Sequence, residues 1–177
     1  MPAKLFTDIF LLYMSLQFRH AAITDLPRIV DIYNSTIAGR MVTADTDPVS
    51  VESRLPWFNA HNTTNRPVWM IDADGQNIGW MSFQSFYGRP AYNGTVEVSI
   101  YLHESSRGKG YGKKILQYAI GIAPQLAIDT LMGLIFAHNL PSIKLFMDMG
   151  FEEWGHLPEI AILDGEKRSL KIFGLKV

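Results

Sequence analysis

The chain has 177 residues, of which 47% are hydrophobic and 19% charged, a composition typical of one globular domain and not of a disordered chain. Lysine and arginine number 16 and aspartate and glutamate 17, so the sequence lacks the basic excess of a nucleic-acid-binding protein. The absence of cysteine excludes disulfides, thiolate metal ligands and a cysteine nucleophile. It also agrees with a reducing compartment, so we expect a cytoplasmic protein.

The N-terminus carries an apolar run, Ile9–Met14, which follows Lys4. A signal peptide needs a longer apolar stretch and a small-residue cleavage site, and the run is much too short to span a bilayer. Met14-Ser15-Leu16 resembles a natural start. We therefore predict that residues 1–14 are an extension and that residues 15–177 form a single domain. The alternative is an N-terminal segment that packs on this domain.

A short strand and two helices are predicted first. Leu16–Ala21 alternates between apolar and polar residues, as a strand does. Thr24 is a candidate N-cap and Gly39 a candidate terminator for the first helix. Its apolar residues at helical spacing are Leu26, Ile29, Val30, Tyr33 and Ile37. Asp47-Pro48 predicts the start of a second helix. The residues expected on its buried face are Val51, Leu55 and Phe58.

Strands dominate the middle of the chain. Val68–Ile71 and Ile78–Phe83 flank Asp72–Gly75, which is a hairpin signal, and Thr95–Leu102 is a further strand. A helix is predicted after Gly112. Its apolar face comprises Ile115, Leu116, Ala119, Ile120 and Ala123.

The last third combines three strands with one short helix. Leu131–Ala137 is an apolar strand, and Asn139–Met149 is a helix ended by the following glycine. Two strands, residues 151–163 and 167–175, surround the turn Asp164-Gly165. The predicted order is β-α-α-β-β-β-α-β-α-β-β. This order indicates an α/β domain with a mixed sheet, as in α+β proteins.

A glycine-rich turn joins the strand that ends at Leu102 to the helix after Gly112. Its sequence is Arg107-Gly108-Lys109-Gly110-Tyr111-Gly112. Glycines allow a tight turn and a close approach to a ligand, and the free N–H groups of the first helical turn suit a pyrophosphate. The turn lacks the Gly-Lys-Ser/Thr of a Walker loop, and the first strand–helix unit of the chain lacks a Rossmann fingerprint. The alternative is a connecting turn without a ligand.

Two segments together resemble the GNAT superfamily of N-acetyltransferases. Arg107-x-x-Gly110-x-Gly112 matches the pyrophosphate-binding pattern of that family. Asn139-x-x-Ser142-x-x-x-Phe146, followed by Gly150-Phe151, resembles its second cofactor segment. The resemblance covers about residues 16–175. It implies the GNAT acyl-CoA N-acyltransferase fold, in which strands four and five splay apart.

Other residues resemble one branch of the family, the phosphinothricin and methionine sulfoximine acetyltransferases. They are Arg40–Thr46, Thr95-Val96-Glu97, Tyr101 and Gly150-Phe151. The branch implies a homodimer that transfers the acetyl group of acetyl-CoA to the α-amine of a small amino-acid analogue. With no activated nucleophile evident, direct attack in a ternary complex is expected. Rival readings are an acetyltransferase for another amine, such as a peptide N-terminus or a polyamine, and a non-catalytic acyl-CoA-binding module.

The resemblance also implies where the ligands bind. The pantetheine arm is expected at Ile100, Tyr101 and Leu102. The pyrophosphate is expected at Arg107 and on the amides of Gly108, Lys109, Gly110, Tyr111, Gly112 and Lys113. Near strand five, the cofactor arm is expected at Asn139 and, secondarily, Ser142. The acceptor is expected at Ser85, Phe86, Tyr87, Arg89, Thr95, Val96 and Glu97. No cluster of His, Asp and Glu has metal-ligand spacing, so no metal is expected.

Glu97 is the candidate for proton transfer. Strand alternation places it on one face with Thr95, Ser99 and Tyr101. A carboxylate within an apolar strand is either a solvated or ion-paired residue or a functional one, and the resemblance favours the latter. An attacking amine arrives mostly as ammonium, and a carboxylate in a partly dry cleft can take its proton directly or through water.

One position departs from the phosphinothricin enzymes, which carry a histidine where this chain has Phe146. His103 and His138 are expected to be surface or packing residues, and the sequence does not choose between Tyr101 and Tyr111 as proton donor.

The resemblance also implies that Arg40–Thr43 and Phe83–Thr95 line the acceptor cleft. These segments contain only two cations, Arg40 and Arg89, and the substrate's α-carboxylate needs one of them. We therefore expect uncharged sulfoximine or sulfone side chains to be preferred over the anionic phosphinate.

Overall fold

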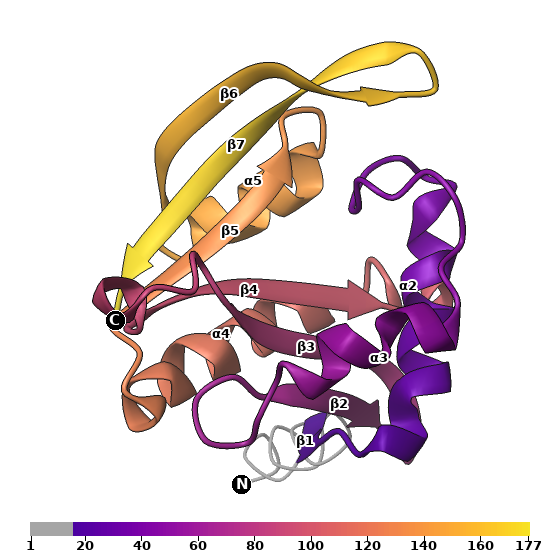
Figure 1. The fold of residues 1–177 in the computed structure, drawn as a ribbon, viewed down its shortest axis with the longest axis vertical. Coiled ribbons are helices and arrows are strands. Elements are labelled where there is room, and N and C mark those ends of the chain that lie inside the picture. Colours follow the sequence, from indigo (N-terminus) through magenta and orange to yellow (C-terminus); the bar gives the residue numbers. More distant parts are fainter. Residues whose placement is uncertain (1–15) are drawn as a thin grey trace, which may run out of the picture.

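The fold is a seven-stranded mixed sheet with helices on both faces (Figure 1). A computed structural model describes residues 16–177, so the extension predicted at residues 1–14 lies outside the described residues. The elements in chain order are β1 (Leu16–His20), α2 (Leu26–Ile37), α3 (Val51–Asn59), β2 (Val68–Ala73), β3 (Gln76–Ser85), β4 (Thr95–Leu102), α4 (Tyr111–Ile122), β5 (Thr130–Phe136), α5 (Leu140–Asp148), β6 (Glu152–Leu163) and β7 (Glu166–Lys176). This is the predicted order of strands and helices.

The strands pair in the order β1-β2-β3-β4-β5-β7-β6. Every neighbouring pair is antiparallel except β4 and β5. These two strands pair in parallel only from Thr95 to Glu97 on β4, opposite residues 130–132 of β5. Beyond that point they diverge, and the β6–β7 hairpin extends away from the rest of the sheet (Figure 1). The predicted splay of strands four and five is confirmed.

Side-chain alternation along the strands builds one core on each face of the sheet. On β2, Trp69 and Ile71 join the core that also contains Ile115 and Leu116 of α4. Val68 and Met70 point the other way and join the core that contains residues of α2, with Trp57 and Phe58 of α3 packed against it. Burial of both faces explains why β2 and the middle of β3, residues 78–83, are almost continuously apolar.

The starts of both N-terminal helices differ from the predictions. Asp25, not Thr24, is the N-cap residue of α2, and its carboxylate accepts hydrogen bonds from the Ala22 amide and the Arg19 guanidinium. The second helix begins after Ser50, whose hydroxyl accepts a hydrogen bond from the Ser53 amide at 3.1 Å. The start predicted at Asp47-Pro48 is therefore wrong.

The predicted buried face of α3 is only partly confirmed. Val51 and Phe58 are half-buried and pack against the core that contains residues of α2, but Leu55 is 37% exposed. Across residues 16–177, no helix combines the length and apolar character needed to cross a membrane.

Candidate active site

The splay between β4 and β5 opens the sheet at its centre. On its other edge β4 remains paired with β3 along its length, from Val96 opposite Ser85 to Leu102 opposite Gly79. The edge of residues 98–102 that faces β5 has no strand partner in the part of the chain that the structure describes. Backbone N–H and C=O groups in such an edge need partners, so this edge is suited to pairing with an extended, amide-containing ligand.

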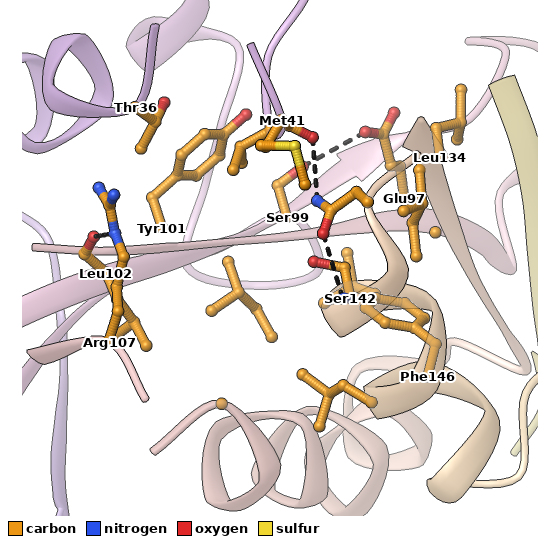
Figure 2. A pocket seen from close by; sticks show the side chains of 18 residues that line it. Thr36, Met41, Glu97, Ser99, Tyr101, Leu102, Arg107, Leu134, Ser142 and Phe146 are labelled. Atoms are coloured by element: carbon orange, nitrogen blue, oxygen red, sulfur yellow. Dashed lines mark hydrogen bonds between the residues drawn. The ribbon is translucent and has the colours of Figure 1, made fainter. Parts of the chain in front are cut away.

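A cavity, here called the splay cavity, occupies this opening (Figure 2). The residues of β4 that line it run from Glu97 to Leu102, and α5 contributes Leu145 and Phe146. The predicted site residues around it are Glu97, Ile100, Tyr101, Leu102, Arg107, Gly112, Asn139 and Ser142. Side chains from four separate segments of the chain therefore meet where the sheet opens.

The glycine-rich turn lies at the start of α4. Gly108 and Gly110 have φ angles of 74° and 78°, which only glycine adopts without strain. Gly110 is the N-cap residue of α4 and provides no capping side chain, so the first-turn N–H groups keep their anion-binding capacity. Gly112 lines the splay cavity, whereas Gly108, Lys109, Gly110, Tyr111 and Lys113 do not.

Arg107 lies at the edge of the splay cavity. Its guanidinium donates to the Leu102 carbonyl at 3.0 Å and to the Ser35 hydroxyl at 3.2 Å. The side chain therefore connects the end of β4 to α2 beside the glycine-rich turn.

Asn139 joins two parts of the cavity wall. Its Oδ1 accepts from the Ser142 amide at 3.2 Å and caps α5, while its Nδ2 donates to the Met41 carbonyl at 2.9 Å (Figure 2). Next to it, Nε2 of His138 lies 2.7 Å from the Arg40 carbonyl. The loop after α2 is thus held over the cavity by consecutive residues that follow β5. The polar groups of Asn139 are already engaged within the protein.

Glu97 lies where β4 and β5 part. Its side chain points to the same face of β4 as Ser99, whose hydroxyl donates to the carboxylate at 3.3 Å (Figure 2). Burial raises the pKa of Glu97 above its ordinary value, and the hydrogen bond from Ser99 only partly opposes this effect. A half-buried carboxylate with a raised pKa is a better proton acceptor than a solvated one.

A second cavity of about 260 Å³, here called the α2–α3 cavity, lies on the face of the sheet covered by α2 and α3. Its walls include Tyr33 of α2, Arg54 and Trp57 of α3, and Trp80 of β3. Three side chains of β4 line both cavities: Glu97, Ser99 and Tyr101. The two cavities therefore meet at the residues of one strand, with the carboxylate at their boundary.

Most residues predicted for the acceptor lie elsewhere. Ser85, Phe86, Tyr87, Arg89, Thr95 and Val96 line neither cavity. Phe86, Tyr87 and Tyr92 form an exposed aromatic cluster, and the Arg89 guanidinium lies 5.5 Å from the centroid of the Tyr87 ring. Val96 is fully buried in the core. It belongs to the face of β4 opposite Glu97, so its side chain cannot reach an acceptor in either cavity.

Arg40, one of the two cations expected in the acceptor cleft, also lies elsewhere. Its guanidinium binds both carboxylate oxygens of Asp164 on the β6–β7 turn, at 2.8 and 2.9 Å. The cation that lines the α2–α3 cavity is Arg54, which the sequence reasoning missed. It is the one cation on α3, a helix that buries none of its residues, so no local pattern distinguishes it.

Phe146 occupies the position of the absent histidine and lines the splay cavity. A Cβ atom on Gly133 of β5 would lie 2.3 Å from the Phe146 ring, so a glycine at this position of β5 makes room for the aromatic side chain.

The two candidate proton donors lie in different places. Tyr101 stacks on Trp80 with ring centroids 4.4 Å apart, and burial raises the pKa of Tyr101. Tyr111 lines neither cavity.

The described residues offer no metal site, and the two nearby histidines hydrogen-bond other parts of the protein. Residues 16–177 contain no group of His, Cys, Asp and Glu that could hold a metal ion. His138 hydrogen-bonds the Arg40 carbonyl and stacks on Phe136, and His103 accepts a hydrogen bond from the Ser105 amide.

Comparisons with known proteins agree with this geometry. The acetyltransferase (GNAT) domain family matches residues 15–152. A Bacillus subtilis protein named "Putative phosphinothricin acetyltransferase YwnH" is 56% identical over 151 residues, which are 85% of this chain and 92% of that protein. The L-methionine sulfoximine/L-methionine sulfone acetyltransferase of Pseudomonas aeruginosa is 32% identical, covering 83% of this chain and 86% of that protein.

A solved structure extends the comparison to the fold. A GNAT superfamily phosphinothricin acetyltransferase from Sinorhizobium meliloti, crystallised in complex with acetyl-CoA, superposes with a TM-score of 0.85. It is 27% identical in sequence, and the match covers 93% of this chain and 89% of that one.

Proposed function

Because the chain belongs to the GNAT family of acetyltransferases, we propose that it moves the acetyl group of acetyl-CoA to the α-amine of a small amino-acid analogue. The acceptor class, which includes methionine sulfoximine, methionine sulfone and phosphinothricin, is supported by the names of its relatives. The observation that carries the proposal is the meeting of the two cavities at Glu97, Ser99 and Tyr101. The splay cavity suits the acyl donor, and the α2–α3 cavity suits the acceptor.

The residues of the splay suit acetyl-CoA. The unpaired edge of residues 98–102 offers backbone partners to the amides of a pantetheine arm. The N–H groups at the start of α4 offer an anion site to the pyrophosphate, and Arg107 adds a cation nearby. Acetyl-CoA supplies the chemistry of an activated thioester carbonyl.

Within this arrangement Glu97 takes the proton of the acceptor ammonium, directly or through water, which frees the nitrogen lone pair for attack. The new C–N bond forms as the C–S bond breaks, and the leaving sulfur takes a proton. Of the two tyrosines considered as donors, Tyr101 lines the cavities and Tyr111 does not. The raised pKa of Tyr101 keeps its hydroxyl protonated and able to donate.

The charges around the cavities favour an amino acid over a polyamine. Glu97 is the sole carboxylate among the residues of the described chain that line the two cavities. A polyamine with several ammonium groups needs several acidic partners, because burying an unpaired charge is costly. The uncharged sulfoximine and sulfone side chains also suit these walls better than the anionic phosphinate.

We further propose that the protein is a homodimer and that it acts in the cytoplasm.

An assay of CoA release tests this function. The protein is incubated with acetyl-CoA and a panel of free amino acids, their sulfoximine, sulfone and phosphinate analogues, polyamines and peptides. Mass spectrometry identifies the product. Acetylation of an amino-acid analogue on its α-nitrogen supports the proposal, and Nα-acetylmethionine sulfone serves as the blocked control. Preferred turnover of a polyamine or peptide, or CoA binding without turnover of any amine, contradicts it. Size-exclusion chromatography with light scattering tests the dimer.

A further inference from the structure

The α2–α3 cavity carries one group of each charge, and the two groups come from different elements. Arg54 of α3 is the one cation among its described lining residues, and Glu97 of β4 is the one anion. The remaining walls are neutral, with Trp57 and Trp80 as the largest side chains. A zwitterionic α-amino acid has the complementary pair of charges, a carboxylate and an ammonium group on one carbon atom.

Arg54 is held in place by contacts that leave most of its donors unused. Its Nη2 lies 2.6 Å from Oδ2 of Asp45, and its guanidinium lies 4.3 Å from the centroid of the Tyr33 ring. The Tyr33 hydroxyl donates to the same Asp45 oxygen at 2.5 Å and hydrogen-bonds Thr43. Asp45 is the only hydrogen-bond acceptor of Arg54 within residues 16–177. A guanidinium has further N–H donors in a planar fork that matches a carboxylate.

The other cations near the acceptor space are committed to protein partners. Arg40 is bound to both oxygens of Asp164. Arg66 is buried and donates through Nε and both Nη atoms to Ser85, Asn65 and Asn93. Arg89 lies beside the exposed Tyr87 ring and lines neither cavity.

We propose that Arg54 binds the α-carboxylate of the acceptor in the α2–α3 cavity and thereby directs the α-amine toward Glu97. This inference rests on the proposed acetylation of an amino acid. Asp45 and Tyr33 orient the guanidinium, and Trp57 and Trp80 cover the uncharged side chain of the acceptor. The α-carboxylate is then what the enzyme uses to distinguish amino acids from simple amines.

The test is a cycle of two acceptors and two proteins. The acceptors are methionine sulfone and the amine obtained by removing its carboxylate. The proteins are the wild type and Arg54→Met, which keeps the apolar length of the side chain. Because the hydrogen bonds from Arg54 to the α-carboxylate are charge-assisted, we expect Arg54→Met to lower kcat/KM for methionine sulfone about 10- to 100-fold. The kcat/KM for the amine should stay within about threefold, since no interaction with it is lost.

Two further variants make the result specific. Arg28→Met removes a half-buried arginine that lines neither cavity and should leave kcat/KM for both acceptors unchanged. Arg54→Lys keeps the charge without the fork and should retain part of the preference for the acid, which keeps the test usable if Arg54→Met does not fold.

The inference is overturned if Arg54→Met and Arg54→Lys lower kcat/KM equally for both acceptors, because this would indicate a structural role through Asp45. It is also overturned if the wild type acetylates the amine as efficiently as methionine sulfone. A wild type that acetylates neither compound nor any other amino acid overturns the proposed function itself.

Discussion

The side-chain amide of Asn139 donates a hydrogen bond to the Met41 carbonyl, 2.9 Å away, and both residues line the splay cavity. The same side chain caps α5 through its Oδ1. One residue therefore fixes the start of a helix and holds the loop after α2 over the cavity. The functions of the two atoms can be separated by substitution.

Replacement of Asn139 by Asp keeps the capping oxygen but removes the donor to Met41. A carboxylate oxygen of the buried residue 139 then faces the Met41 carbonyl, and an unsatisfied buried acceptor costs about 1–3 kcal/mol. We expect a lower melting temperature and a raised KM for both substrates, as measured by calorimetry and steady-state kinetics. Asn65→Asp, which makes the same exchange at an exposed residue that lines neither cavity, is the matched control. Equal effects of the two variants would contradict the role given to the Met41 contact.

Glu97→Gln should lower kcat about 10²–10⁴-fold, the usual contribution of a general base. Acetyl-CoA affinity should remain nearly unchanged, because the amide fills the same space at the boundary of the cavities. Pre-steady-state kinetics and calorimetry with CoA measure the two quantities. Glu152→Gln, which changes an exposed carboxylate at the start of β6, is the matched control and should behave as wild type. Wild-type turnover by Glu97→Gln would falsify the assignment of the base.

The pH profile follows from the raised pKa of Glu97. The active form is the carboxylate, so kcat/KM, which reports the free enzyme, should fall as the pH drops through a pKa above that of an ordinary glutamate. Because the folded-state pKa exceeds the unfolded one, the folded state binds the proton more tightly and loses stability as the pH rises between the two values. Glu97→Gln should therefore abolish the acidic limb of the kcat/KM profile and be at least as stable as wild type at neutral pH. An unchanged limb in the variant would assign it to another group.

Substitutions of glycines at the start and in the interior of α4 should separate CoA binding from the stability of the helix. Gly112→Val places a side chain against Leu145, whose Cδ2 would lie 3.1 Å from the new Cβ, and narrows the splay cavity. Gly110→Val adds strain at a φ of 78°. Both should weaken CoA binding in calorimetry. Gly121→Ala, in the same helix with open space around it, should instead stabilise the protein by about 0.5–1 kcal/mol with CoA affinity unchanged. Unaltered affinity in both valine variants would rule out the pyrophosphate site.

Local patterns in the sequence predicted the fold because they report local physics. The turn at Asp74 and Gly75 joins β2 to β3 with both residues at positive φ, as a tight hairpin requires, and Thr95–Leu102 matches β4 in both bounds and alternation. The start of α3 was missed because Asp47-Pro48 imitates a helix start, while the hydroxyl of Ser50 provides the cap.

The candidate site was only partly predictable for the same reason. Motif spacing identified many residues of the splay cavity, since Arg107–Gly112 and Asn139–Phe146 adjoin the strands that splay. The α2–α3 cavity depends on contacts between distant segments, such as that of Arg54 with Tyr33 and the approach of α3 to β4. The alternation of side chains along β4 could by itself have excluded Val96 from the acceptor site, because Val96 points to the face opposite Glu97.

The most direct test of the central claim is a crystal structure of the protein with CoA and methionine sulfone, a combination that cannot react. We predict the CoA sulfur in the splay cavity and the methionine sulfone in the α2–α3 cavity. The α-nitrogen should lie within hydrogen-bonding reach of the Glu97 carboxylate, directly or through one water molecule, on the side that faces the sulfur. An amino acid bound away from Glu97, or a CoA sulfur outside the splay between β4 and β5, would contradict this mechanism.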